Sequence, residues 1–184
     1  MQEKTIQKLA LTGMFLALGL VLPFLTGQIQ QIGNMLLPMH LPVFLCALVC
    51  GWKYGVPMAF VLPLMRSFLF GMPPLFPTAV AMAFELATYA FIAGFLYGRV
   101  RRQGVRAVYA CLLIAMIAGR LVWGVVQVIL LGLSGSAFTL QMFWAGAFLN
   151  AIPGIILQLV LIPVIMVLLD RTHLVPFRRE EAAA

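Results

Sequence analysis

Three charged residues, Arg66, Glu85 and Arg120, interrupt long apolar stretches of the sequence. A carboxylate can neutralise one arginine in a structural salt bridge, and a second arginine then still needs a partner. Guanidinium groups bind carboxylates well because their planar fork donates two parallel hydrogen bonds. We therefore expect at least one of the two arginines to bind an anionic or strongly accepting ligand. For Glu85 and the arginine that pairs with it, a structural salt bridge between helices is the alternative to a role in ligand binding.

Polar and aromatic residues at helical spacing accompany these charges. Glu85 and Tyr89 are four residues apart, and Arg120, Trp123 and Gln127 fall on one face of a helix. A position at the membrane interface is the alternative role of each tryptophan, and for Trp144 it fits about as well as a ligand role does. For His40, a structural role at the start of a helix is favoured over ligand binding. Gln158 is expected to lie too deep in the membrane to line a pocket. The candidate ligand-binding residues are Glu85, Tyr89, Arg120, Trp123, Gln127, Asn150, Arg66, Asn34 and His40.

The composition identifies lipid as the solvent of this chain. Of its 184 residues, 64% are apolar and only 9% are charged, whereas soluble domains have about 45–50% and about 25%. Three dispersed cysteines are too few for a disulfide framework. Cys46, Cys50 and His40 lack the fourth ligand of a structural zinc site, so we expect no metal and no cofactor. A phosphate-binding loop is also missing from the sequence, which excludes ATP hydrolysis by that route.

Six apolar stretches approach the roughly 20 residues that a helix needs to cross a hydrocarbon core of about 30 Å. They cover residues about 6–26, 36–51, 55–70, 78–97, 107–133 and 138–169. The second and third are short, and Pro153 and Pro163 predict a kink or tilt in the sixth. The predicted fold class is an all-α integral membrane protein, a single six-transmembrane-helix bundle over residues 1–184.

Basic residues orient this bundle. Apart from Arg66 and Arg120, every Lys and Arg lies at a terminus or in a loop on one side of the six-helix arrangement. The opposite loops, at about 27–37, 71–77 and 134–137, have none. Because cytoplasmic loops are enriched in Lys and Arg, we expect both termini in the cytoplasm. The basic run from Arg99 to Arg106 then indicates topology and anionic-lipid contacts rather than nucleic-acid binding.

Taken together, the chain resembles the substrate-binding (S) components of energy-coupling factor (ECF) vitamin transporters. The resemblance rests on six spans in about 180 residues, on cytoplasmic ends and on a short second helix. It rests also on residues 37–55, which end in a turn from Gly51 to Gly55, and on residues 84–87 and 94–98. In that family the S component sits in the bacterial plasma membrane and captures a vitamin or related micronutrient from outside. It docks on a transmembrane coupling protein with two ATPase subunits, and it reorients to release its cargo.

The resemblance also implies sites. The family docks through an Ala-xxx-Ala surface on its first helix, and Gly13 and Ala17 occupy the matching place here. Its pocket is formed by the first outer loop and the outer halves of helices four to six, which contain most of the candidates named above, whereas Arg66 falls partly outside. An excess of positive charge would favour a cargo with a carboxylate. Pantothenate is our first expectation, and folate, a B6 vitamer and a queuosine precursor remain open.

Two other classes of function compete with cargo capture. A stand-alone secondary carrier is usually larger and contains inverted repeats, which this sequence does not show. A membrane-embedded transferase would need a nucleophile or a metal site, and we find neither in the sequence. We therefore expect a transport subunit and not an enzyme.

Overall fold

The computed structural model describes residues 2–26, 36–135, 139–147, 151–172, 174–175 and 177, and these contain seven α-helices and no strand. The α-helices are α1 (Gln2–Val21), α3 (His40–Cys50), α4 (Trp52–Phe70), α5 (Val80–Arg99), α6 (Val105–Leu133), α7 (Leu140–Ala147) and α8 (Ile152–Arg171). A 3₁₀ turn η1 (Leu22–Thr26) follows α1, and a π-helical turn η2 (Leu75–Ala79) precedes α5. The all-α prediction is confirmed for this part of the chain.

Among the described residues, four stretches are long and apolar enough to cross a membrane. They are Thr5–Phe24, Leu75–Arg99, Val105–Leu133 and Ile152–Arg171. Helix α3 has only 11 residues, which at about 1.5 Å per residue gives it about half the thickness of a hydrocarbon core. Helix α4 has 19 residues but contains Pro57, Pro63 and the charged Lys53 and Arg66.

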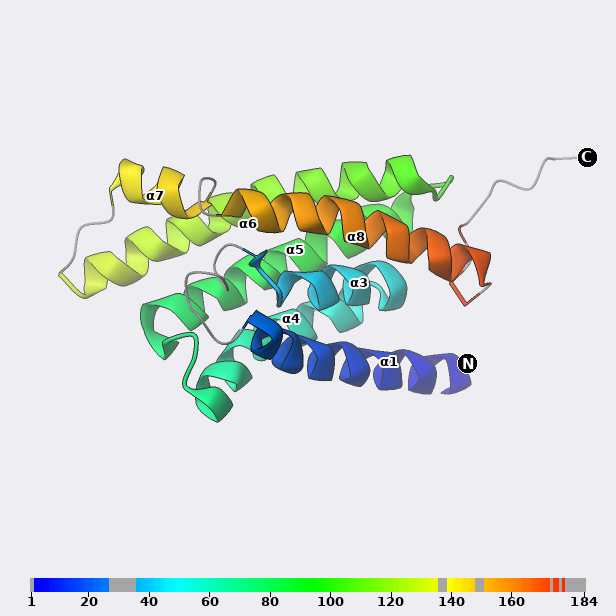
Figure 1. Cartoon of the computed structure of the whole chain (residues 1–184), viewed down its shortest axis with the longest axis horizontal. Coiled ribbons are helices and arrows are strands. Elements are labelled where there is room, and N and C mark those ends of the chain that lie inside the picture. Colours follow the sequence, from blue (N-terminus) through cyan, green and yellow to red (C-terminus); the bar gives the residue numbers. More distant parts are fainter. Residues whose placement is uncertain are drawn as a thin grey trace, which may run out of the picture.

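The helices form a bundle whose long elements run in alternating directions (Figure 1). The beginning of α1 and the end of α8 lie at one end of the molecule, and α7 lies at the other end beside α6 (Figure 1). Helix α5 packs against α3, α4 and α6. The core lies along α3 and α5, where Phe44, Leu86 and Ala90 are fully buried.

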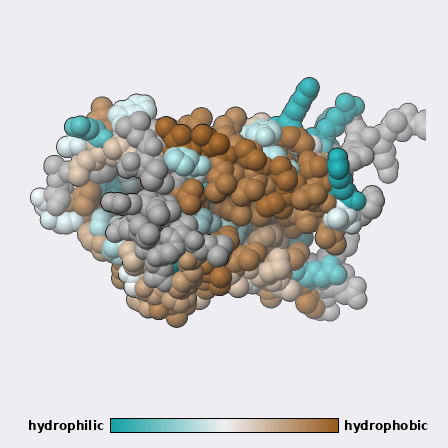
Figure 2. Space-filling view, viewed as in Figure 1, coloured by the Kyte–Doolittle hydropathy of each residue, from teal (hydrophilic) through white to brown (hydrophobic). Residues whose placement is uncertain are grey.

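The outer surface of the bundle is apolar, as expected of a chain dissolved in lipid. Figure 2 shows hydrophobic residues over the middle of one face, with hydrophilic side chains gathered toward the ends. Leu121, Val125 and Ile156 are more than half exposed. Because lipid tails solvate such side chains, their exposure carries no hydrophobic penalty in the bilayer.

The predicted boundaries of the second, third and fourth helices need correction. The helix predicted over 36–51 begins only at His40, because Pro38 lies in a turn and Leu37 has a positive φ of 51°. The helix predicted from residue 55 begins at Trp52, directly after Gly51. The helix predicted over 78–97 is preceded by the turn η2 and extends to Arg99.

The largest correction concerns the single helix predicted over 138–169. The structure has two helices there, α7 and α8, and α8 starts one residue before Pro153. Proline suits the first turn of a helix because it has no amide hydrogen to donate. Pro153 therefore marks a helix start rather than a kink, while Pro163 is accommodated inside α8.

Candidate functional site

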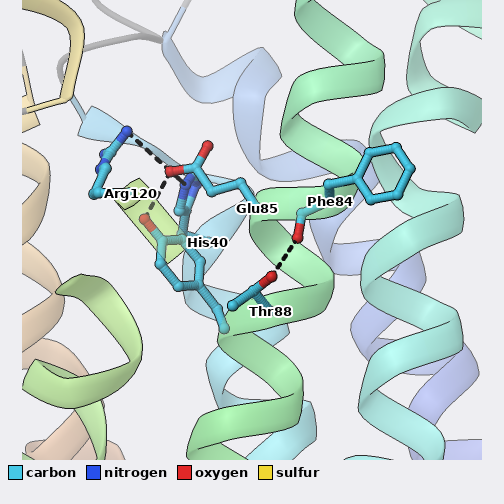
Figure 3. Close-up of polar contacts among 6 residues, drawn as sticks. His40, Phe84, Glu85, Thr88 and Arg120 are labelled. Atoms are coloured by element: carbon cyan, nitrogen blue, oxygen red, sulfur yellow. Dashed lines mark hydrogen bonds and ion pairs between the residues drawn. The ribbon is translucent and has the colours of Figure 1, made fainter. Parts of the chain in front are cut away.

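A buried carboxylate forms the centre of the polar interior. Glu85 of α5 is 1% exposed, and its Oε1 lies 2.9 Å from Nη1 of Arg120 on α6. The hydroxyl of Tyr89 donates to the same oxygen at 2.7 Å, and Nε2 of His40 on α3 lies 3.8 Å away. Figure 3 shows the Arg120 and His40 side chains directed at the Glu85 carboxylate. Three helices thus bring their polar groups to one point, which we call the Glu85 cluster (His40, Glu85, Tyr89 and Arg120).

Aromatic packing fixes the geometry of this cluster. The ring of Tyr89 stacks on Phe44 with centroids 5.1 Å apart, and it contacts the ring of His40 at 5.4 Å. On its other side it meets α6 at Gly119, where an added Cβ would overlap the ring. Gly119 therefore allows α5 and α6 to approach closely enough for the ion pair to form. Sequence reasoning missed Gly119, although a glycine next to a charged residue inside a helix is a signal of close packing.

Several polar side-chain atoms are buried without a hydrogen-bond partner among the described residues. They are Arg120 Nη2, Gln127 Oε1, Gln158 Nε2 and both ring nitrogens of His40. An unsatisfied buried polar group costs about 1–3 kcal/mol, and more when it is charged. Such groups are rare in native structures unless a ligand, water or ion completes them. Arg120 is the clearest case, because one of its terminal nitrogens binds Glu85 and the other has no partner in this part of the chain.

Gln158 belongs to this set, although the sequence placed it too deep to line a site. It is 2% exposed and lies on α8, which packs against α3 and α6. These are the helices that carry His40 and Arg120. Gln127 lies two turns from Arg120 along α6 and is 7% exposed.

Aromatic residues cover the C-terminal half of α6. The ring of Trp123 lies against Gly146 of α7, and its centroid is 6.4 Å from that of Phe143. Phe143 in turn lies against Gly124. Trp144 is 53% exposed, which fits the interfacial role considered for it. Helix α7 is thereby held on α6 next to the turn that contains Arg120.

Arg66 lies in a different environment from Arg120. It is 3% exposed, and its Nη1 donates to the carbonyl oxygen of Leu20 at 2.6 Å. Its guanidinium lies 5.0 Å from the ring centroid of Phe24 and 5.4 Å from that of Phe70. Among the described residues, Glu85 pairs with Arg120 rather than with Arg66. The expected excess of positive charge around one carboxylate is therefore not supported by the geometry.

The remaining candidates divide into two groups. Asn34 and Asn150 lie outside the described residues. Gly13 and Ala17, the expected docking residues, are exposed on α1, and a Cβ added at Gly13 would meet nothing within 4 Å. This face of α1 is thus open to a partner helix, whereas Gly19 of the same helix faces the side chain of Leu62 on α4.

Apolar helices around a buried, incompletely satisfied polar cluster define a membrane protein with an interior site, because ionisable groups at membrane depth mark sites and pathways. A family model described as "ECF transporter, substrate-specific component" matches residues 7–166. The chain belongs to this family, and the resemblance found in its sequence is confirmed. It is therefore a transporter subunit and not an enzyme, and a multi-pass protein of the cell membrane. Searches of curated proteins and of solved structures give no match to this chain.

Proposed function

We propose that this S component binds a small polar cargo beside the Glu85 cluster, between α3, α5, α6 and α8. The observation that carries the proposal is the buried Nη2 of Arg120, which has no partner among the described residues. An acceptor atom of the cargo would complete its hydrogen bonds. Because an incompletely satisfied arginine is costly in an apolar interior, bound cargo would stabilise the folded protein.

The buried, unpartnered polar atoms can accommodate a carboxylate cargo that also has hydroxyl or amide groups. Arg120 Nη2 and one ring N–H of His40 can donate to the two oxygens of a carboxylate. Gln127 Oε1 accepts a hydrogen bond, and Gln158 Nε2 donates one. Pantothenate has a carboxylate, hydroxyls and an amide, so it is our first candidate. Folate, a B6 vitamer and a queuosine precursor are the other candidates.

We further propose that α1, α3, α4, α5, α6 and α8 form six spans with both termini in the cytoplasm. The alternating helix directions support this topology (Figure 1). The distribution of Lys and Arg supports the orientation. Helix α3 would begin at mid-depth, which brings its first residue, His40, to the level of Glu85. Cargo would enter from the extracellular side.

The proposed partners are a transmembrane coupling protein and two ATPase subunits. The exposed face of α1 at Gly13 and Ala17 would contact the coupling protein, because small residues allow two helices to approach closely in a membrane. In this arrangement the chain supplies selectivity and the ATPases supply energy.

The proposal is tested by mass spectrometry of small molecules retained through purification. Wild type should retain a vitamin-like carboxylate, Arg120→Ala should lose it, and Arg101→Ala, which removes an exposed charge, should keep it. Reconstitution of the chain alone, and of the chain with its coupling module, distinguishes the transport classes. Uptake that requires the module and ATP supports the proposal, whereas uptake by the chain alone under an ion gradient would establish a secondary carrier.

A further inference from the structure

Three aromatic rings form a cluster where α4 begins and α5 ends. The ring of Trp52, the first residue of α4, meets Phe91 edge-on with centroids 5.6 Å apart and Phe95 at 6.4 Å. Phe91 and Phe95 stack on each other at 5.3 Å. Trp52 is 38% exposed and Phe91 is 43% exposed. The cluster therefore presents ring surface to the surroundings of the bundle.

Two cations lie over the same cluster. Nζ of Lys53 is 5.9 Å from the ring centroid of Trp52, and Cζ of Arg99 is 4.0 Å from that of Phe95. Both side chains are exposed. A cation–π contact orients a cation without neutralising it. The charges of Lys53 and Arg99 thus remain available to an anion at the edge of the rings.

The backbone brings these groups together and adds positive potential. Gly51 turns the chain from α3 into α4 with a φ of 92°, a conformation that favours glycine. An added Cβ at Gly94 would lie 2.7 Å from the Trp52 nitrogen, so only glycine permits this approach of α5. Gly51 offers no side chain to cap α4. The start of α4 therefore directs its partial positive charge toward the same edge.

An apolar track leads from this edge toward the middle of the membrane. Phe91 and Phe84 follow Arg99 down α5, and Phe84 meets Phe60 of α4 edge-on at 5.4 Å. Phe60 is 37% exposed and Phe84 is 43% exposed. From Arg99 to Phe84 the helix rises by roughly 22 Å. Cations at one end and exposed rings along this length match an amphiphile with an anionic head and an acyl chain.

We propose that this surface, formed by Trp52, Lys53, Phe91, Phe95 and Arg99, is a binding site for an anionic phospholipid. Its phosphate meets Lys53 and Arg99 at the start of α4, and an acyl chain lies along Phe91 and Phe84. The site is separate from the cargo site, and it requires only that α4 and α5 lie in the bilayer. A soluble phosphate ligand would contact only the cations and leave the exposed rings uncovered. An anionic phospholipid contacts both the cations and the rings, so it is the occupant that matches the whole surface.

The test measures quenching of Trp52 fluorescence by lipids with brominated acyl chains. The protein is reconstituted in mixed phosphatidylglycerol and phosphatidylcholine bilayers in which only one of the two lipids is brominated. The contribution of Trp52 is the difference between wild type and Trp52→Phe. Two surface cations favour an anionic lipid by on the order of tenfold or more. We expect brominated phosphatidylglycerol to quench Trp52 far more than brominated phosphatidylcholine at equal bromine content.

Matched variants separate a specific site from general surface charge. Lys53→Gln/Arg99→Gln should abolish the preference, Lys53→Arg/Arg99→Lys should retain it, and Arg101→Gln/Arg106→Gln removes the same charge elsewhere and should leave it intact. Equal quenching by both lipids in wild type would overturn the proposal. So would an equal loss in the Arg101/Arg106 variant, because general attraction of the basic end would then explain the result. The charge-conserving variant keeps the test valid if the Gln variant does not fold.

Discussion

Glu85→Gln tests the ion pair in the interior most directly. The substitution keeps the size of the side chain and an oxygen that can accept from Tyr89, and it removes the negative charge. Arg120 then remains buried at 5% exposure without a counterion among the described residues. The variant therefore isolates the electrostatic contribution of the pair from its packing.

The geometry sets the expected size of the effect. At 2.9 Å, the Coulomb attraction is about 6 kcal/mol for an effective dielectric constant of about 20. Part of it offsets the desolvation of both groups, and the removal of one partner from a buried pair costs about 3–5 kcal/mol. In a domain of 184 residues, each kcal/mol lowers the melting temperature by about 2–4 °C. Glu85→Gln should therefore melt roughly 6–20 °C below wild type.

The assay uses the cysteine thiols that are buried in the folded protein. Cys46, Cys50 and Cys111 are free and buried, so a maleimide dye should react with them as the protein unfolds in detergent. The temperature of half-maximal dye reaction gives the melting temperature of each variant. The measurement is made on cargo-free protein, because bound cargo would add its own stabilisation.

Two further variants test the ion pair from the side of Arg120. Arg120→Met should be destabilised by a similar amount because it leaves Glu85 without its cation. The double variant Glu85→Gln/Arg120→Met should recover most of the loss, since exchange of both partners of a buried pair is often nearly neutral. A double variant less stable than either single variant, or an unchanged melting temperature in Glu85→Gln, would refute the account of the pair.

Three more predictions follow from the contacts. Gly119→Ala should displace the Tyr89 ring and weaken cargo binding at least about tenfold, a loss of about 1.4 kcal/mol of binding free energy. Calorimetry measures the affinity, and an unchanged value would contradict the close packing of Gly119 against Tyr89. Arg66→Lys keeps the charge but loses the planar contact with two rings, so it should lower the stability measured in the dye assay by about 1–2 kcal/mol. Cargo affinity should stay unchanged. Weakened cargo binding would instead place Arg66 in the cargo site. Gly13→Leu should prevent copurification with the coupling module while cargo retention persists, with Ala17→Gly as the conservative control; intact copurification would exclude this face of α1.

Much of the Glu85 cluster could be predicted from charge and spacing. Glu85 and Arg120 are conspicuous in the sequence because ionisable groups within apolar spans are costly and need partners. The four-residue spacing of Glu85 and Tyr89 places them one helical turn apart, and their hydrogen bond confirms the shared face. The pairing of Glu85 with Arg120 instead of Arg66 could not be read from the sequence, because it depends on which helices are neighbours.

Other features depend on three-dimensional packing that leaves little trace in a sequence. Pro153 is compatible with a kink and with a helix start, and only the observed start of α8 at Ile152 distinguishes them. Gln158 sits in an apolar stretch, and its burial next to α3 and α6 follows from the path of α8. His40 does begin a helix, as expected, but it also reaches Glu85 because α3 starts late.

The pairing of Glu85 with Arg120 also bears on how the chain is assembled during synthesis. The two residues lie on successive helices, α5 and α6, joined by the short segment 100–104. Each charge alone would oppose transfer from the translocon into lipid by about 2.5–3.5 kcal/mol. We therefore expect α5 to wait at the translocon until α6 has been made, and the two to partition into the bilayer as a neutral hairpin.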